Sequence, residues 1–333
     1  MDGTDSGAGH SAVEGLAALD DRVVPFTVPD LDVRGRVVRL GASIDTILAR
    51  HGYPEPVARV LGEAAALTVL LGTALKFEGR FQLQTKSDGP ISMLVVDFNA
   101  PDVYRAVAHF DAERLAEAEV AGRLSTGELL GEGHLAMTVD QGSATTRYQG
   151  VVALTRQSLE EAAHQYFRQS EQIPTRVRLG AAELFDRDED GKPRRTWRAG
   201  GLIAQFLPDA PERMRQPDLH GGDGDDRDTD LHGDDAWDEA RMLVETIDAD
   251  ELTDPQVGIE RLLFRLFHER GVRAYEPQPV HDRCSCSRDR LKGVLQGFTA
   301  EEIEASTEDG KITVSCEFCS TNYEFVPDEL MAN

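Results

Sequence analysis

The segment KITVSCEFCSTNYEF, residues 311–325, places Cys316 and Cys319 between two runs that have the composition of β-strands. Upstream, the run HDRCSCS supplies Cys284 and Cys286. Four thiolates in two close pairs are the ligand set of a tetrahedral structural zinc site, in which each sulfur lies ~2.3 Å from the metal. The pattern therefore predicts that all four cysteines bind one Zn²⁺ ion, with the second pair in a knuckle between two strands.

Other interpretations of these cysteines are weaker. A thioredoxin-like exchange site places C-x-x-C at the start of a helix, whereas Cys319 is followed by STNYEFVP. His281 is an alternative metal ligand, but with four cysteines available we expect it to be a surface histidine. The simplest interpretation is that zinc only stabilises a module too small to fold alone, which is the role of most Cys₄ sites.

The one-residue gap between Cys284 and Cys286 departs from the gap of two to four residues in ordinary zinc ribbons. It keeps two sulfurs very close, so this pair is well placed to oxidise to a disulfide. Such a disulfide would close a tight, strained ring and would be reduced again more easily. The spacing therefore favours a reversible switch over a permanent structural site.

The overall composition and charge of the chain indicate where the protein acts and which partners it does not bind. The chain has 333 residues and a formal net charge of −25, a balance that keeps a protein soluble and repels the phosphates of nucleic acid. No stretch approaches the ~20 apolar residues of a membrane span, and the N-terminus lacks the features of a secretory signal. We therefore expect a cytoplasmic protein with neither a nucleic-acid nor a membrane partner, in which thiols stay reduced.

The pattern along the chain predicts an α+β fold with an N-terminal α+β core domain, a helical linker and a small C-terminal four-cysteine zinc module. The Asp- and Gly-rich composition after residue 208 marks the end of the core. We expect a disordered tail at 1–20, the core domain at 21–208, an acidic flexible linker or insertion at 209–235, a helical linker region at 236–275 and a zinc-binding redox-switch domain at 276–333.

Several core elements are marked by local signals. Pro54-Glu55-Pro56 opens a long helix that is apolar on more than one face, which predicts a buried helix. RFQLQTKS and ISMLVVDF flank Asp88-Gly89-Pro90 and predict a hairpin. VYRAVAHF, HLAMTVDQ and TTRYQGVVAL predict further strands, and Ser158 with Glu161 forms a capping box that begins another helix.

The linker region contains two predicted helices. The first is AWDEARMLVETI, and the second is predicted to have Asp254 as its N-cap, Pro255 as its first residue and Gly271 just after its end. The second has the i, i+3, i+4, i+7, i+8 spacing of a helix with one buried face. Its apolar stripe consists of Ile259, Leu262, Leu263, Leu266 and Phe267.

Taken together, these motifs resemble the 33 kDa chaperonins, the redox-regulated heat shock protein 33 family. The resemblance rests on the C-x-C and C-x-x-C tail with RLLFRLFHERGVRAYEPQPV before it and TNYEF after it. It continues through GRVVRLGASIDTILARHGYPEPVARVLGEAAALTVLL, LQTKSDGPISMLVVDF, MTVDQG, YFRQSEQIPT and AGGLIAQFLP, and so covers most of residues 25–330. The N-terminal tail and the acidic stretch at 218–235 depart from the family pattern.

The resemblance implies a non-enzymatic, redox-regulated holdase that binds unfolding proteins under oxidative stress. It further implies that in the reduced state zinc holds all four cysteines and the protein is a monomer. Oxidation is then expected to form the disulfides Cys284–Cys286 and Cys316–Cys319, to expel zinc, to unfold the C-terminal module and the linker, and to give an active homodimer. No G-x-x-x-x-G-K-[ST] motif is present, so we expect no ATP-driven refolding by this chain.

Two rival classes remain. A constitutive zinc-ribbon interaction protein would behave identically before and after oxidation. A dithiol–disulfide oxidoreductase would turn over a disulfide substrate, and removal of zinc would affect its fold little. The C-x-C spacing, the small module and the resemblance along the whole chain favour the chaperone.

Overall fold

The computed structural model describes residues 20–75, 79–141, 147–187, 190–207 and 235–331. Its mixture of helices with two six-stranded sheets and one two-stranded sheet confirms the α+β fold class. The predicted tail at 1–20 and the predicted acidic linker at 209–235 lie outside the described residues, apart from one residue each. The predicted domain limits stay a prediction.

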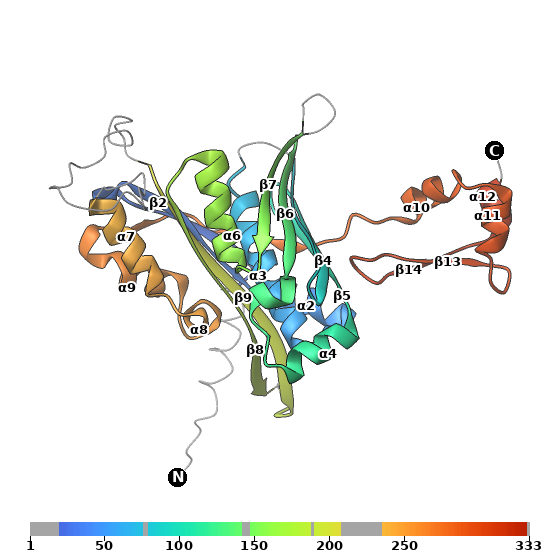
Figure 1. Cartoon of the computed structure of the whole chain (residues 1–333), viewed down its shortest axis with the longest axis horizontal. Coiled ribbons are helices and arrows are strands. Elements are labelled where there is room, and N and C mark those ends of the chain that lie inside the picture. Colours follow the sequence, from blue (N-terminus) through green and yellow to red (C-terminus); the bar gives the residue numbers. More distant parts are fainter. Residues whose placement is uncertain (1–19, 76–78, 142–146, 188–189, 208–234, 332–333) are drawn as a thin grey trace, which may run out of the picture.

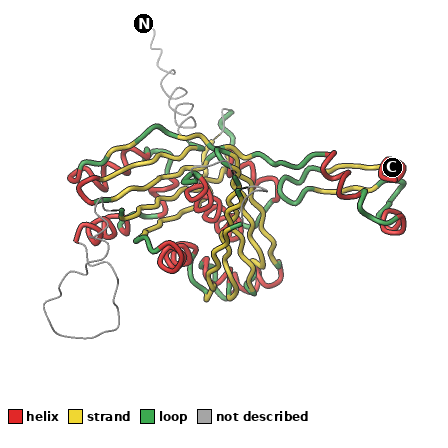
Figure 2. Tube along the Cα trace, turned by 90° about the horizontal axis from the view of Figure 1, so that it is seen from above, coloured by secondary structure: helices red, strands yellow, loops and turns green. Residues whose placement is uncertain are grey.

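Helix α3 (Glu55–Gly72) forms the centre of the main core. Nearly all of its side chains are buried, as the apolar sequence on more than one face predicts. It contacts strands of both six-stranded sheets, and Figure 2 shows the sheets spread at an angle with helices between them. Around it lie α2 (Ala42–His51), α4 (Ala112–Val120), α5 (Thr126–Leu130) and α6 (Leu159–Tyr166), the last followed by a π-helical turn, η2 (Phe167–Glu171).

The first sheet has the order β10-β1-β2-β9-β8, with β11 also paired to β1, and its described pairs are antiparallel. One face packs on α3, and its strands contribute to two separate apolar cores. The strands are β1 (Arg22–Val28), β2 (Val33–Leu40), β8 (Thr175–Arg187), β9 (Pro193–Phe206), β10 (Arg273–Ala274) and β11 (Gln278–Pro279), with the short helix η1 (Pro29–Leu31) between β1 and β2.

The second sheet has the order β12-β5-β4-β3-β6-β7. The hairpin predicted around Asp88-Gly89-Pro90 is confirmed as β3 and β4, and the three further predicted strands are β5, β6 and β7. Among the described strand pairs of this sheet, only β12 runs parallel to its neighbour, β5. The strands are β3 (Arg80–Ser87), β4 (Ile91–Asn99), β5 (Val103–Phe110), β6 (Glu132–Asp140), β7 (Tyr148–Thr155) and β12 (His281–Asp282).

The linker helices cover the outer face of the first sheet (Figure 1). They are α7 (Asp235–Glu245), α8 (Ala249–Thr253) and α9 (Ile259–Phe267), followed by η3 (His268–Arg270). Together with the sheet they form the linker core, which is separate from the main core. From the first sheet and η1, its buried residues are Val24, Phe26, Val28, Leu31, Val33, Val37, Leu202, Ala204 and Phe206. From the linker helices and the turns between them, they are Trp237, Ala240, Val244, Ile247, Leu252, Ile259, Leu262, Leu263, Leu266 and Phe267.

The predicted start of the second linker helix is wrong. Helix α9 begins at Ile259 with Gly258 as its N-cap. Asp254 instead ends α8, and its side chain accepts a hydrogen bond from the backbone N–H of Gln256 (2.8 Å) in an Asx turn. The apolar stripe and the stop at Gly271, which has a φ of 69°, are confirmed.

The C-terminal module lies at the opposite end of the molecule from the linker helices (Figure 1). It contains α10 (Arg288–Leu295), α11 (Ala300–Ala305), the hairpin of β13 (Ile312–Ser315) and β14 (Asn322–Phe325), and α12 (Pro327–Met331). Its apolar core is small. The buried side chains are Leu295, Ile303, Ile312, Phe325 and Leu330.

Candidate metal and redox centre

Two backbone segments bring the four cysteines together. The first follows β12, whose pairing with Val103 and Tyr104 fixes where the chain turns toward Cys284 and Cys286. The second is the turn between β13 and β14, which contains Cys316 and Cys319. The Ser320 N–H donates to the Cys316 carbonyl (2.8 Å), and the Cys316 N–H donates to the Thr321 carbonyl (2.9 Å). These bonds close the knuckle that the strand-like flanks predicted.

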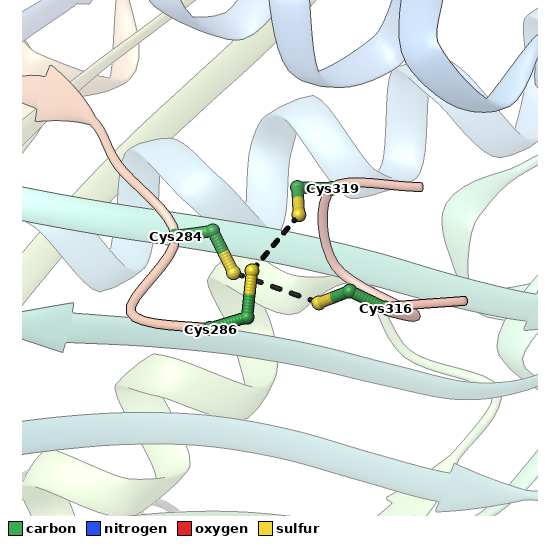
Figure 3. A group of neighbouring side chains, drawn as sticks. All are labelled: Cys284, Cys286, Cys316 and Cys319. Atoms are coloured by element: carbon green, nitrogen blue, oxygen red, sulfur yellow. Dashed lines mark hydrogen bonds between the residues drawn. The ribbon is translucent and has the colours of Figure 1, made fainter. Parts of the chain in front are cut away.

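All four sulfurs lie within 4.8 Å of one another. The Sγ atoms of Cys284 and Cys316 are 3.6 Å apart, and those of Cys286 and Cys319 are 3.4 Å apart. Figure 3 shows both of these pairs reaching across from one segment to the other. Four sulfurs placed ~2.3 Å from a central tetrahedral ion would be about 3.8 Å apart. The four free thiols are therefore compatible, in donor type and in spacing, with one metal ion held between them.

Neighbouring hydroxyl groups tune the thiols. Burial raises the pKa of Cys286 to about 12, although the Tyr323 hydroxyl, 3.2 Å from its sulfur, opposes this shift. Burial also raises the pKa of Cys316. At Cys319 burial acts in the same direction, but hydrogen bonds with Thr321, including one of 3.2 Å to its hydroxyl, outweigh it and lower the pKa to about 7. Cys319 thus loses its proton more readily than Cys286 or Cys316.

The core contacts the cysteine segments at several points. The His51 imidazole, at the end of α2, lies 3.2 Å from the Phe318 carbonyl oxygen and 3.3 Å from the Ser320 hydroxyl. Arg50 forms an ion pair with Asp282 (2.7 Å). Arg105 of β5 donates to the Cys284 sulfur (3.6 Å). The cysteine group therefore rests against the edge of the second sheet and the end of α2.

The structure brings together the four cysteines that the sequence singled out. His281 is exposed and outside this group, as expected. Sequence reasoning missed the surrounding residues His51, Arg105 and Tyr323. Tyr323 lies within the quoted knuckle segment, so its position after Cys319 was a usable signal, whereas nothing local marks the other two.

A family model described as "Hsp33 protein" matches residues 21–326 of the chain. The chain belongs to the Hsp33 family. The 33 kDa chaperonin of Caulobacter vibrioides (strain NA1000 / CB15N) is 45% identical over 311 residues, which cover 93% of this chain and 96% of that protein. The 33 kDa chaperonin of Shewanella loihica is 37% identical over 301 residues, 90% of this chain and 91% of that protein.

The fold agrees with this family. A crystal structure of the 33 kDa chaperonin from Thermotoga maritima matches with a TM-score of 0.69 and 21% identity, covering 93% of this chain and 96% of that one. Membership of the Hsp33 family assigns a chaperone function, and with it the binding of unfolded client proteins. Within the described residues no helix is long and apolar enough to cross a membrane.

Proposed function

We propose that this Hsp33-family protein is a cytoplasmic, ATP-independent holdase that is inactive while Cys284, Cys286, Cys316 and Cys319 hold a zinc ion, and active once these thiols are oxidised. In this proposal it is not an enzyme. It prevents the aggregation of unfolding clients under oxidative stress and passes them to other chaperones. The observation that carries the proposal is the cysteine group, which joins two segments of a module with a very small core.

The small core makes the module dependent on the cysteines. Its buried apolar side chains number only a few among the described residues, and each contributes about 1.5–3 kcal/mol at most. A bound structural zinc ion would supply folding free energy on the order of 10–16 kcal/mol. The thiols bind the ion only while they are reduced and deprotonated, so the fold of the module depends on their redox state.

Oxidation would cut the connection between the two segments. In the proposed pairing, Cys284 bonds to Cys286 and Cys316 bonds to Cys319. Each pair of thiols gives up two electrons and two protons, and one hydrogen peroxide molecule takes them and becomes two water molecules. The close sulfur contacts of 3.6 and 3.4 Å run between the segments, whereas both disulfides would lie within a segment. Neither closes a long loop, so neither replaces the lost constraint.

Unfolding of the C-terminal module would also release the linker helices from the first sheet and so expose a client-binding surface. In the linker core, apolar side chains of the first sheet face apolar side chains of α7 to α9. Separation of these surfaces would expose a large contiguous apolar area, the type of surface that binds unfolded proteins. The acidic composition keeps such a form in solution. We further propose that the reduced form is a monomer and the oxidised form a homodimer, with the apolar surfaces partly buried between the two copies.

Light scattering of a heat-unfolded client tests the proposal. The protein is added reduced and zinc-loaded, or after treatment with hydrogen peroxide, and the released zinc and the sedimentation coefficient are measured in the same samples. We expect only the oxidised, zinc-free form to suppress aggregation, and reductant with zinc to reverse the effect. A variant with all four cysteines changed to serine should suppress aggregation without oxidant.

The rival classes give different results in this assay. Equal suppression by both forms would leave the cysteine group as a purely structural site. Turnover of a small disulfide substrate, together with an intact fold after zinc removal, would instead identify an oxidoreductase.

A further inference from the structure

One core side chain, Arg105, contacts both halves of the cysteine group. Its Nη1 donates to the Cys284 sulfur (3.6 Å) and to the Ser285 hydroxyl (3.2 Å) in the first segment. The centre of the guanidinium also lies 3.9 Å from the centroid of the Phe318 ring. In sequence, Phe318 lies between the two cysteines of the second segment. A planar cation stacked on an aromatic ring at this distance is a favourable contact.

Strand pairing places the guanidinium at this point. Strand β12 runs parallel to β5, with His281 opposite Val103 and Asp282 opposite Tyr104. The Arg283 N–H then donates to the Tyr104 carbonyl (3.2 Å). One further step of this register would place Arg283 beside Arg105, so Cys284, the next residue along the chain, lies close to the Arg105 side chain. The contact therefore follows from the sheet, and the arginine and the cysteine approach from the core and the module respectively.

A buried carboxylate fixes the guanidinium in place. Asp97 of β4 is fully buried, and Arg105 donates to its Oδ2 from Nε (2.9 Å), with Nη2 at 2.7 Å. The other oxygen, Oδ1, accepts from Arg80 (2.6 and 3.1 Å) and from Gln82 (2.8 Å). Arg105 itself is only 18% exposed. With two of its nitrogens bound to Asp97, the third is held toward the sulfur.

We propose that Arg105 is a positioning residue for the redox chemistry of the cysteine group: it stabilises the anionic Cys284 sulfur and thereby slows oxidation of the thiols. The proposal rests on the proposed function, because it concerns the rate at which oxidation of the cysteines activates the chaperone. It extends that function by assigning a residue of the core domain, far from the cysteines in sequence, to control of the switch.

The expected direction follows from the charge change at sulfur. Oxidation by hydrogen peroxide converts two thiolates, one peroxide and two protons into one disulfide and two waters, so the negative charge on sulfur disappears. A cation that stabilises the thiolate more than the neutral product slows this step, because sulfur nucleophilicity falls as the thiolate is stabilised. Metal-binding thiols are already deprotonated, so the guanidinium cannot act by creating more thiolate.

The test is the rate of peroxide oxidation of the zinc-loaded, full-length protein, followed by zinc release. Arg105→Gln should oxidise about tenfold faster than the wild type, which corresponds to about 1.4 kcal/mol and is close to the lower end of what a hydrogen bond to a charged group contributes. Arg105→Lys keeps the positive charge but loses the forked guanidinium and its contact with the Phe318 ring. Its oxidation rate should lie between those of the wild type and Arg105→Gln. Arg80→Gln is the matched control: Arg80 also binds Asp97, but within the described part of the chain none of its side-chain hydrogen bonds or ion pairs reaches a cysteine segment. Its rate should match the wild type.

A second rate distinguishes an effect of Arg105 on the reactivity of the thiols from a weaker association of the two cysteine segments. Zinc transfer to an excess of strong chelator, without oxidant, measures how firmly the segments are held. We expect Arg105→Gln to change the chelator rate much less than the peroxide rate. In the cobalt(II)-substituted protein the thiolate-to-metal absorption band of Arg105→Gln should move to lower energy, and that of Arg80→Gln should stay in place. Circular dichroism establishes that each variant is folded, and if Arg105→Gln is not, Arg105→Lys carries the comparison.

An unchanged peroxide rate in Arg105→Gln, or an equal rise in both rates without a cobalt band shift, would overturn the inference. These outcomes are distinct from failure of the proposed function, since none of them measures client binding. If the oxidised wild type held clients while Arg105→Gln oxidised at the wild-type rate, only the role of Arg105 would be wrong. If oxidised wild type failed to hold clients, the switch itself would be wrong.

Discussion

One added methyl group at Gly200 should release the linker from the core without touching the cysteines. Gly200 lies in β9, opposite Arg39 of β2 and Gly180 of β8. A Cβ atom at this position would lie 2.3 Å from the carbonyl oxygen of Leu252 and 3.0 Å from its carbonyl carbon. Both atoms belong to the backbone of α8, so Gly200→Ala can be accommodated only if the helix and the sheet move apart.

The magnitude follows from the contacts that would be lost. Overpacking of this kind costs about 1–3 kcal/mol. Moving α8 also breaks the hydrogen bond from Arg39 Nη2 to the Glu251 carbonyl (3.0 Å), which contributes about 0.5–1.5 kcal/mol. Together these shift linker docking by about 1.5–4.5 kcal/mol toward the undocked state, a population change of at least about tenfold. At Gly180 the closest approach is 2.8 Å, so Gly180→Ala should have a smaller effect.

The assay uses reduced, zinc-loaded protein. We expect Gly200→Ala to suppress aggregation of a heat-unfolded client without oxidant, to retain its zinc, and to show faster amide exchange in residues 249–267. The matched control is Gly293→Ala in α10, where an added Cβ meets no atom within 4 Å; it should behave as the wild type. Fast amide exchange in the linker without any client protection would refute the assignment of the linker core as the client-binding surface. Unchanged amide exchange would refute the packing argument.

Two further predictions concern stability. Phe267→Ala removes a fully buried ring that stacks on Phe26 (5.8 Å between centroids) and should lower the free energy of unfolding, measured in urea, by about 3–5 kcal/mol. Phe264→Ala, at a 61% exposed position, should change this free energy little. Similar losses in the two variants would contradict the packing assigned to the linker core. Burial, aided by Arg176, lowers the pKa of His164 to about 4 from 6.5, so stability should fall as the pH drops, by about 3 kcal/mol between pH 7 and pH 4. His164→Gln, which can still accept from the Val177 N–H (2.8 Å), should remove that part of the pH dependence, and equal pH dependence in both proteins would show that His164 is not the cause.

The cysteine group was predictable because its information is local. Each pair of cysteines lies within four residues of sequence, and the strand-like flanks of Cys316 and Cys319 indicate a hairpin knuckle. The same holds for α3, whose apolar sequence requires burial on several sides, and for the β3–β4 hairpin with its Asp-Gly-Pro turn. In these elements the chemistry of neighbouring residues settles the structure.

The linker shows where local reasoning ends. Helix α8 has only five residues, with a capping box between Asp248 and Glu251, and its place against Gly180 and Gly200 depends on residues far away in sequence. Asp254 and Pro255 have the composition of a helix start, yet a turn forms there and α9 begins at Ile259. The two glycines permit close approach of α8 to the sheet, and this packing is invisible to a local pattern.

The contact between Arg105 and Cys284 is beyond local patterns for the same reason, since 179 residues separate the two. It depends on the short strand β12 at the edge of the second sheet, while β10 and β11 pair with β1 at the edge of the first. The segment 273–282 therefore connects the cysteine group to the linker across both sheets, through strands of only two residues each. Between them Val280 is fully buried in the main core. So few backbone hydrogen bonds provide little resistance to unfolding, so in the proposed function loss of order at the cysteines would reach the linker core through this segment.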